Sequence, residues 1–164
     1  MRAATQVSKI VRASREIIYE ACLSAEKLAL WRAPENMKAY VHVFDGREGG
    51  SYRMSLTYTD PKNTTGGKTS EYTDTFQGKF TELVPYEKIV ELIQFESPEP
   101  TFGGEMRMTT TLVDVREGTE VTVLCENLPA GIRPEDNELG CRSSLRNLAR
   151  LVEYSNRLSY LLAR

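Results

Sequence analysis

Residues 134–155 read PEDNELGCRSSLRNLARLVEYS, and this stretch decides the fold because its apolar side chains recur at the spacing of a helix. Pro134 suits a first helical position, where its missing N–H loses no intrahelical bond. Acidic residues follow in the first turn and arginines come later, as the helix dipole favours. The buried stripe comprises Cys141, Leu145, Leu148 and Val152, widened by Ala149 and Leu151. The stretch predicts a long C-terminal helix over about 134–155, with a potential extension beyond it.

The chain before this helix, from about residue 38 to 127, has an apolar period of two. The clearest strand holds Tyr52, Met54, Leu56 and Tyr58 on one face, opposite polar residues. In the preceding strand, the alternation places Tyr40, His42 and Phe44 on one face and the valines between them on the other. Later strands are predicted around Tyr72–Phe80 and over 88–96, 105–115 and 119–127, with a bulge or a close approach at Gly78.

The N-terminal part predicts one strand over 5–12 followed by two short helices. Ser14 suits the N-cap of a helix over 15–22, because its hydroxyl can accept from an otherwise unpaired amide. Ser24 can cap a second helix, which carries Leu28 and Trp31 on one side and ends near Pro34. The order is one strand, two short helices, about six antiparallel strands and a long helix.

This order predicts an α+β fold in which a curved antiparallel sheet of about six to seven strands wraps around the C-terminal helix. We expect a single domain over 1–164, with its core over roughly 5–155. A strongly twisted sheet cannot lie flat on a straight helix, so curvature tends to leave space between them. That space is a natural pocket for an apolar ligand.

Composition excludes much catalytic chemistry, because the chain has 164 residues with one histidine and three widely spaced cysteines. We expect no metal, no cofactor and no complete disulfide framework. A net charge of −2 gives no global attraction to nucleic acid. The chain shows neither a signal peptide nor a membrane span, and we expect a soluble, cytoplasmic protein whose oligomeric state stays open.

Five segments in this order carry a family resemblance: IYEACLSAEKLALWRAP, FDGREGGSYR, FQGKFTELVPYEKIVELIQF, REGTEVTVLCENLP and ELGCRSSLRNLARLVE. Over roughly residues 5–155 the chain resembles the activator-of-heat-shock-protein-90-ATPase homologue family, in the START-like, birch-pollen-allergen-like SRPBCC superfamily of helix-grip folds. The resemblance implies this fold and a cavity. Family members divide between binders of small hydrophobic ligands or lipids, stress-related proteins and co-chaperone domains, and the fold does not choose among them.

The chain departs from the family pattern at several positions. Cys22, Arg32 and Cys141 stand where the family often has an aromatic residue, and the smaller cysteines would enlarge the cavity unless neighbours fill the volume. Glu91 stands between Ile89 and Ile93, where the family tends to have an apolar or aromatic residue. If the strand register holds, Glu91 points its carboxylate into the pocket.

The predicted ligand-binding residues lie on the strands, the second short helix and the long helix. They are Trp31, Tyr40, His42, Phe44, Tyr52, Met54, Leu56, Phe76, Glu91, Met108, Thr110, Leu145 and Leu148. His42 and Glu91 would form the one acid–base pair of the chain. Each also has a reading without function: His42 as an edge or hydrogen-bonded histidine, and Glu91 in water after a one-residue change of register.

Two further motifs carry less weight. Residues 60–69 predict a hairpin loop, and Gly66-Gly67-Lys68-Thr69 within it is not a phosphate loop, because the upstream glycine is missing and a strand follows instead of a helix. Arg142, Arg146 and Arg150 recur every four residues and are more typical of a solvated helix face than of a contact with an acidic partner.

The sequence supports three hypotheses. The first is a non-enzymatic protein that binds a small hydrophobic or aromatic molecule in the cavity between sheet and helix. The second is a stand-alone co-chaperone that stimulates a heat-shock-protein-90-type ATPase. The third is an enzyme that resembles a polyketide cyclase, which would require His42 or Glu91 beside bound substrate.

Overall fold

The computed structural model describes residues 2–60, 67 and 72–162, without the side chains of 155–160. Most of the predicted 60–69 loop, including three residues of the Gly66–Thr69 motif, lies outside the described residues. The elements follow in the order β1 (Thr5–Val11), α1 (Arg15–Cys22), α2 (Ala25–Trp31), β2 (Met37–Phe44), β3 (Ser51–Tyr58), β4 (Thr73–Val84), β5 (Lys88–Phe95), η2 (Pro100–Phe102), β6 (Met106–Val115), β7 (Gly118–Glu126) and α3 (Pro134–Leu162).

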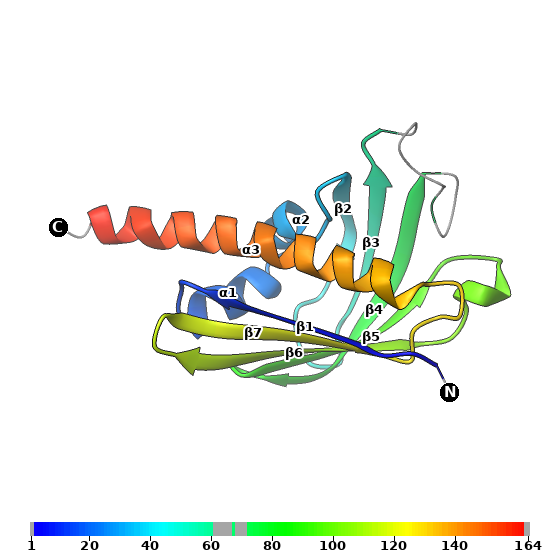
Figure 1. Ribbon diagram of the computed structural model, residues 1–164, viewed down its shortest axis with the longest axis horizontal. Helices are drawn as coiled ribbons and strands as arrows, with labels where there is room; N and C mark the ends of the chain where they lie inside the picture. Colours follow the sequence, from blue (N-terminus) through cyan, green and yellow to red (C-terminus); the bar gives the residue numbers. More distant parts are fainter. Residues whose placement is uncertain (1, 61–66, 68–71, 163–164) are drawn as a thin grey trace.

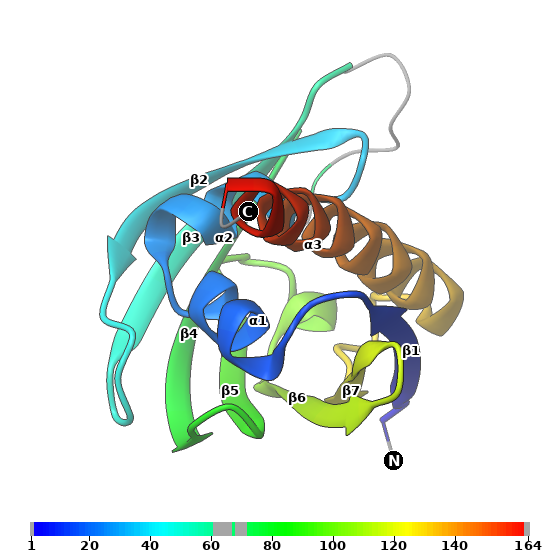
Figure 2. The same cartoon turned by 90° about the vertical axis from the view of Figure 1, so that its left-hand side faces the viewer.

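The strands form one antiparallel sheet of seven strands in the order β1-β7-β6-β5-β4-β3-β2. The sheet curves around α3, which crosses its concave side, while α1 and α2 lie beside the helix (Figures 1 and 2). This is the predicted α+β helix-grip fold. The N-terminal strand β1 forms one edge of the sheet. It pairs with β7 along its whole length, from Thr5 opposite Cys125 to Val11 opposite Thr119.

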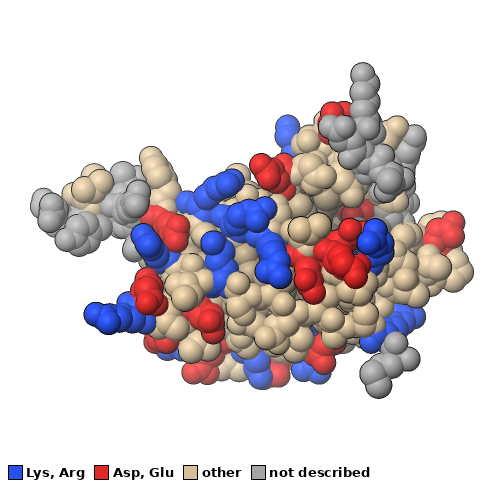
Figure 3. All heavy atoms as spheres, viewed as in Figure 1, with Lys and Arg blue, Asp and Glu red and all other residues tan. Residues whose placement is uncertain are grey.

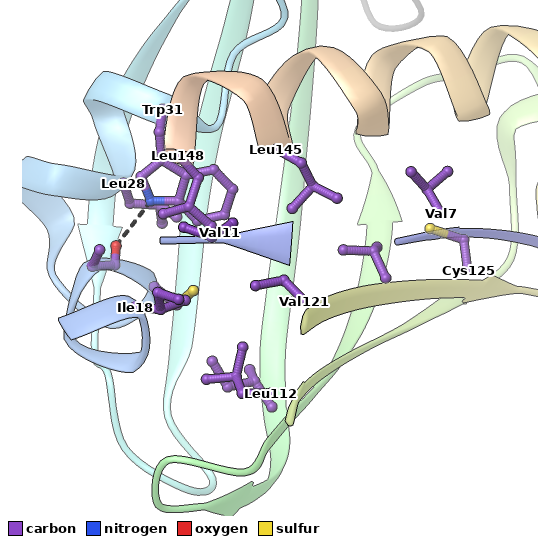
Figure 4. Close-up of a cluster of buried hydrophobic side chains, with 14 of the residues drawn as sticks. Val7, Val11, Ile18, Leu28, Trp31, Leu112, Val121, Cys125, Leu145 and Leu148 are labelled. Carbon is purple, nitrogen blue, oxygen red and sulfur yellow. Dashed lines mark hydrogen bonds between the residues drawn. The ribbon is translucent and has the colours of Figure 1, made fainter. Parts of the chain in front are cut away.

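The two short helices begin where the sequence predicts. The Ser14 side chain accepts a hydrogen bond from the Ile17 amide at 3.3 Å, and Ser24 caps α2 in the same way through the Lys27 amide at 3.4 Å. The Trp31 indole N–H at the end of α2 then donates to the Ala21 carbonyl of α1 at 2.9 Å (Figure 4). This buried bond fixes the angle between the two helices.

The hydrophobic core lies between the concave face of the sheet and the helices. Leu145 and Leu148 of α3 lie over Val11 and Val121 of the sheet (Figure 4), and each is at most 2% exposed. α3 continues beyond the predicted 134–155 to Leu162, and Figure 1 shows this last part projecting past the sheet. No helix among the described residues is long and apolar enough to cross a membrane.

Strand β2 departs from the predicted alternation. Its register to β3 shifts between Val41, which pairs with Met54, and Val43, which pairs with Arg53, so His42 occupies a bulge. The prediction that Tyr40, His42 and Phe44 share a face is therefore wrong. Phe44 packs against the core, whereas Tyr40 is 66% exposed and His42 is also exposed.

Candidate functional site

A cavity of about 750 Å³ lies between the sheet and α3. Strands β3 to β7 line it from one side, and α2, the segment that follows α2, and α3 line it from the other. The apolar residues of its wall include Trp31, Leu56, Phe76, Ile89, Ile93, Phe95, Phe102, Met106, Met108, Val121, Val123, Leu145 and Leu148. The volume lies within the range of roughly 300–1,000 Å³ that is typical of small-molecule sites.

A polar cluster interrupts this apolar wall. The Arg32 Nη1 lies 3.6 Å from Oε1 of Glu91, and the two side chains are only 11% and 5% exposed. The Tyr52 hydroxyl donates to the same oxygen of Glu91 at 2.6 Å. Arg32 also donates to the Met108 sulfur at 3.4 Å, and its guanidinium carbon lies 5.9 Å from the centroid of the Phe76 ring. One cation and one carboxylate therefore lie together beside the cavity.

Burial and the charges of this cluster change the pKa values of its members. Burial and the nearby Glu91 carboxylate raise the pKa of the Tyr52 hydroxyl well above its usual value. The same two causes raise the pKa of the Cys22 thiol to about 12. Burial by itself lowers the pKa of Arg32, but the Glu91 carboxylate opposes this effect and the pKa is raised. Tyr52 and Cys22 thus stay protonated, and Arg32 stays charged, at neutral pH.

Hydrogen bonds from α3 hold the segment that carries Arg32. The Ser144 hydroxyl donates to the Arg32 carbonyl at 2.6 Å, and the Asn147 amide donates to the Ala33 carbonyl at 2.8 Å. Two residues further, the Glu35 amide donates to the Ser143 hydroxyl at 2.8 Å. These bonds satisfy backbone groups just beyond the end of α2 and fix where the guanidinium enters the cavity.

Close backbone packing holds Tyr52 in place. Gly78 of β4 lies opposite Tyr52 of β3, and a Cβ atom at Gly78 would stand 2.0 Å from the tyrosine ring. Glycine is therefore required here, which confirms the predicted close approach, and the bulge of this strand lies further on, between Phe80 and Glu82. The ring packs close to the Gly78 backbone while its hydroxyl reaches Glu91.

The predicted site residues separate into three groups. Those that line the cavity are Trp31, Leu56, Phe76, Glu91, Met108, Thr110, Leu145 and Leu148. Phe44, Tyr52 and Met54 belong to the interior but pack behind the cavity wall. Tyr40 and His42 lie on the outer face of the sheet, where their rings contact each other with centroids 4.8 Å apart.

The predicted His42–Glu91 pair is wrong. His42 Nε2 forms a 2.7 Å hydrogen bond with Ser55, which in turn bonds Thr75, and these residues face away from the cavity. The bulge in β2 is the physical reason, because it reverses the alternation on which the prediction depends. Glu91, in contrast, keeps the register that points it inward, and the alternative that places it in water is wrong.

Arg32 is a charged residue of the site that the predictions omitted. Its sequence signal was present, because both Arg32 and Glu91 are charged where the resembling family favours apolar or aromatic residues. Asp74, which is 3% exposed and lines the cavity, was also omitted.

All three cysteines are free, and two of them line the cavity. Cys22 lies on the α1 side of the cavity and Cys141 on α3, while Cys125 is buried on β7. A cytoplasmic location stays a prediction. Among the described residues, no group of three or more histidine, cysteine, aspartate or glutamate side chains could hold a metal ion.

The outer surface over α3 carries mixed charge. Arg142, Arg146 and Arg150 are exposed, and Arg142 lies 3.6 Å from Glu138 one turn earlier in the helix. Figure 3 shows a group of basic side chains near the middle of this face, with acidic side chains on either side of it. The arrangement fits the predicted solvated helix face.

Comparisons with solved structures find the same architecture in bacterial proteins. A protein from Chromobacterium violaceum is 30% identical, with a TM-score of 0.79 over 92% of this chain and 98% of its own. A protein from Rhodobacter sphaeroides is 17% identical, with a TM-score of 0.72 and 92% of each chain covered. An AHSA1-like protein from Aeromonas hydrophila is 15% identical, with a TM-score of 0.70 and 94% of each chain covered. The last two show the fold alone.

A search of curated proteins finds no match. A family model with the description Activator of Hsp90 ATPase homolog 1-like protein matches residues 12–153, from the residue after β1 into the second half of α3. The match spans both short helices, six strands and the part of α3 that covers the cavity. The chain therefore belongs to the family of Activator of Hsp90 ATPase homolog 1-like proteins, within the START-like superfamily.

Proposed function

We propose that this protein binds a small hydrophobic or aromatic molecule in the cavity between the sheet and α3, without catalysing a reaction. The cavity carries the proposal: it has a volume of about 750 Å³, a mostly apolar wall and a buried polar cluster at Arg32 and Glu91. Sites of this kind bind a ligand through apolar contact and orient it through a few polar groups. The family and its fold support a ligand-binding domain in general.

Thermal unfolding with naphthalene as the probe tests this proposal. At a hundredfold excess over the dissociation constant, binding to the folded state adds about 2.7 kcal/mol, which corresponds to a rise in Tm of about 5–10 °C. Leu56→Trp places a large ring in the cavity and should abolish most of the rise. Tyr40→Trp is the matched control on the outer face and should leave it unchanged.

Two results would count against cavity binding. One is no rise in Tm for the wild type with naphthalene or with medium-chain alcohols. The other is an equal rise in Leu56→Trp and in the wild type. If Leu56→Trp does not fold by circular dichroism, Thr110→Leu fills the cavity from β6 with a smaller side chain.

The family match favours one second candidate function, which is stimulation of a heat-shock-protein-90-type ATPase through the surface of the domain. A coupled ATPase assay with the chaperone of the same organism tests it. We expect stimulation that Leu56→Trp preserves, because that side chain lies in the interior. No stimulation at saturating protein would eliminate this candidate.

A further inference from the structure

The polar cluster indicates which class of ligand the cavity accepts, and this inference rests on the proposed function. The guanidinium of Arg32 lines the cavity, and its neighbours in the cluster are the Met108 thioether, which is a weak acceptor, the Tyr52 hydroxyl and the Glu91 carboxylate. Its ion-pair distance to Glu91, 3.6 Å, is longer than a good hydrogen bond. A guanidinium has five N–H donors, so Arg32 keeps donor capacity for an oxygen atom of a ligand.

Glu91 offers the complementary group. Its Oε1 accepts the hydrogen bond of the Tyr52 hydroxyl and is also the oxygen that contacts Arg32. Its Oε2 accepts no hydrogen bond from any residue that the structure describes. The side chain lines the cavity and is 5% exposed. A carboxylate oxygen in such a position is a strong acceptor for a ligand O–H or N–H.

The charge of the cluster decides between a neutral and an anionic ligand. The positive charge of Arg32 and the negative charge of Glu91 cancel each other, and burial keeps the Tyr52 hydroxyl neutral. A ligand carboxylate that reached Arg32 would lie beside the carboxylate of Glu91, and like charges repel strongly where water is scarce. A neutral group that accepts from Arg32 and donates to Glu91 meets no such repulsion.

We propose that the cavity selects an uncharged ligand with an apolar or aromatic body and one group that both donates and accepts a hydrogen bond, such as a phenol, an alcohol or an amide. The group contacts both Arg32 and Oε2 of Glu91 from the cavity, and the body lies along the apolar wall near Phe76, Ile89 and Leu148. Free fatty-acid anions and aromatic carboxylates are then disfavoured.

A matched series of probes tests the selection by calorimetric titration: naphthalene, 2-methoxynaphthalene, 2-naphthol and 2-naphthoate. One charge-assisted hydrogen bond is worth about tenfold or more in affinity. We expect 2-naphthol to bind about tenfold more tightly than naphthalene and more tightly than the methoxy compound, which cannot donate. We expect 2-naphthoate to bind more weakly than 2-naphthol.

Glu91→Gln sharpens the test because it changes the charge and keeps the shape. The variant leaves Arg32 as an uncompensated cation, so the preference should shift from 2-naphthol to 2-naphthoate. His42→Gln, on the outer face, is the control and should keep the wild-type order of affinities. If Glu91→Gln does not fold, the order of affinities of the wild type for the four probes still tests the proposed selection.

The possible outcomes separate the two proposals. Equal affinities for naphthalene and 2-naphthol, or tightest binding of 2-naphthoate to the wild type, would overturn the selection and leave cavity binding intact. Absence of binding by all four probes would overturn cavity binding itself, and the selection with it. Tightest binding of 2-naphthol, with the shift in Glu91→Gln, supports both.

Discussion

Arg32 and Glu91 lie 3.6 Å apart between α2 and β5, and their side chains are 11% and 5% exposed. They are separated widely in sequence, and hydrogen bonds from α3 hold the Arg32 segment while Tyr52 holds Glu91. A buried pair of this kind adds little net stability over an apolar pair, but removal of one partner leaves a buried charge uncompensated. The pair is therefore better explained by the selectivity of the cavity for its ligand than by the stability of the fold.

Arg32→Met should lower the free energy of unfolding by about 3 kcal/mol, because the Glu91 carboxylate stays buried without its cation. The double variant Arg32→Met/Glu91→Leu should recover most of this loss. Urea unfolding of the wild type, both single variants and the double variant gives the coupling energy. Additive losses in the double variant would show that the two side chains do not interact.

Tyr52→Phe should lower the free energy of unfolding by about 1.5–3 kcal/mol, because it removes a 2.6 Å hydrogen bond to a buried carboxylate. Tyr154→Phe is the control, since Tyr154 is 71% exposed and should change stability by no more than about 0.5 kcal/mol. Equal effects in the two variants would contradict the buried bond.

Gly78→Ala should destabilise the fold by about 3 kcal/mol, because the added methyl would stand 2.0 Å from a tyrosine ring whose hydroxyl is fixed. Gly140→Ala is the matched control: its nearest neighbour would be 3.9 Å away in a helix, so the change should be neutral or stabilise by up to about 1 kcal/mol. Denaturation of both variants measures the difference, and similar stabilities would refute the packing.

Much of this architecture could be predicted from local sequence. Ser14 and Ser24 mark the starts of α1 and α2 because capping depends on a residue and its next few neighbours. The alternation of β5 allowed either face for Glu91, because both faces of this strand carry apolar residues, and the structure places it on the inner one. The face of His42 could not be predicted, because a bulge is set by pairing with the neighbouring strand and leaves no local pattern. Arg32 reaches the cavity only through the packing of α2 on α3, and the hydrophobic period of a single helix does not predict such packing.

Stability should fall as the pH rises above about 9. The folded state raises the pKa of Cys22 from 9.0 to about 12, and raises that of Tyr52 above 10.0, so the unfolded chain loses these protons first. The unfolded state then binds fewer protons, and each group lowers the free energy of unfolding by up to about 1.4 kcal/mol per pH unit. Their stabilisation is fully present below pH 9.

Cys22→Ala removes one of these groups and should make the decline between pH 9 and 12 shallower. Urea unfolding at several pH values measures the slope for the variant and the wild type. Identical slopes in the two proteins would show that the Cys22 thiol ionises as freely in the folded state as in the unfolded state.

The position of a bound probe tests the central claim most directly. Isotope-filtered nuclear Overhauser spectra of the methyl-labelled protein with 2-naphthol report which methyl groups lie within about 5 Å of the ligand, a reach comparable to direct packing contact. Cavity binding predicts cross-peaks to Ile89, Leu145 and Leu148, which line the cavity, and none to Leu30 or Val43 on the outside. Cross-peaks to Leu30 or Val43 without any to the cavity methyl groups would contradict the account.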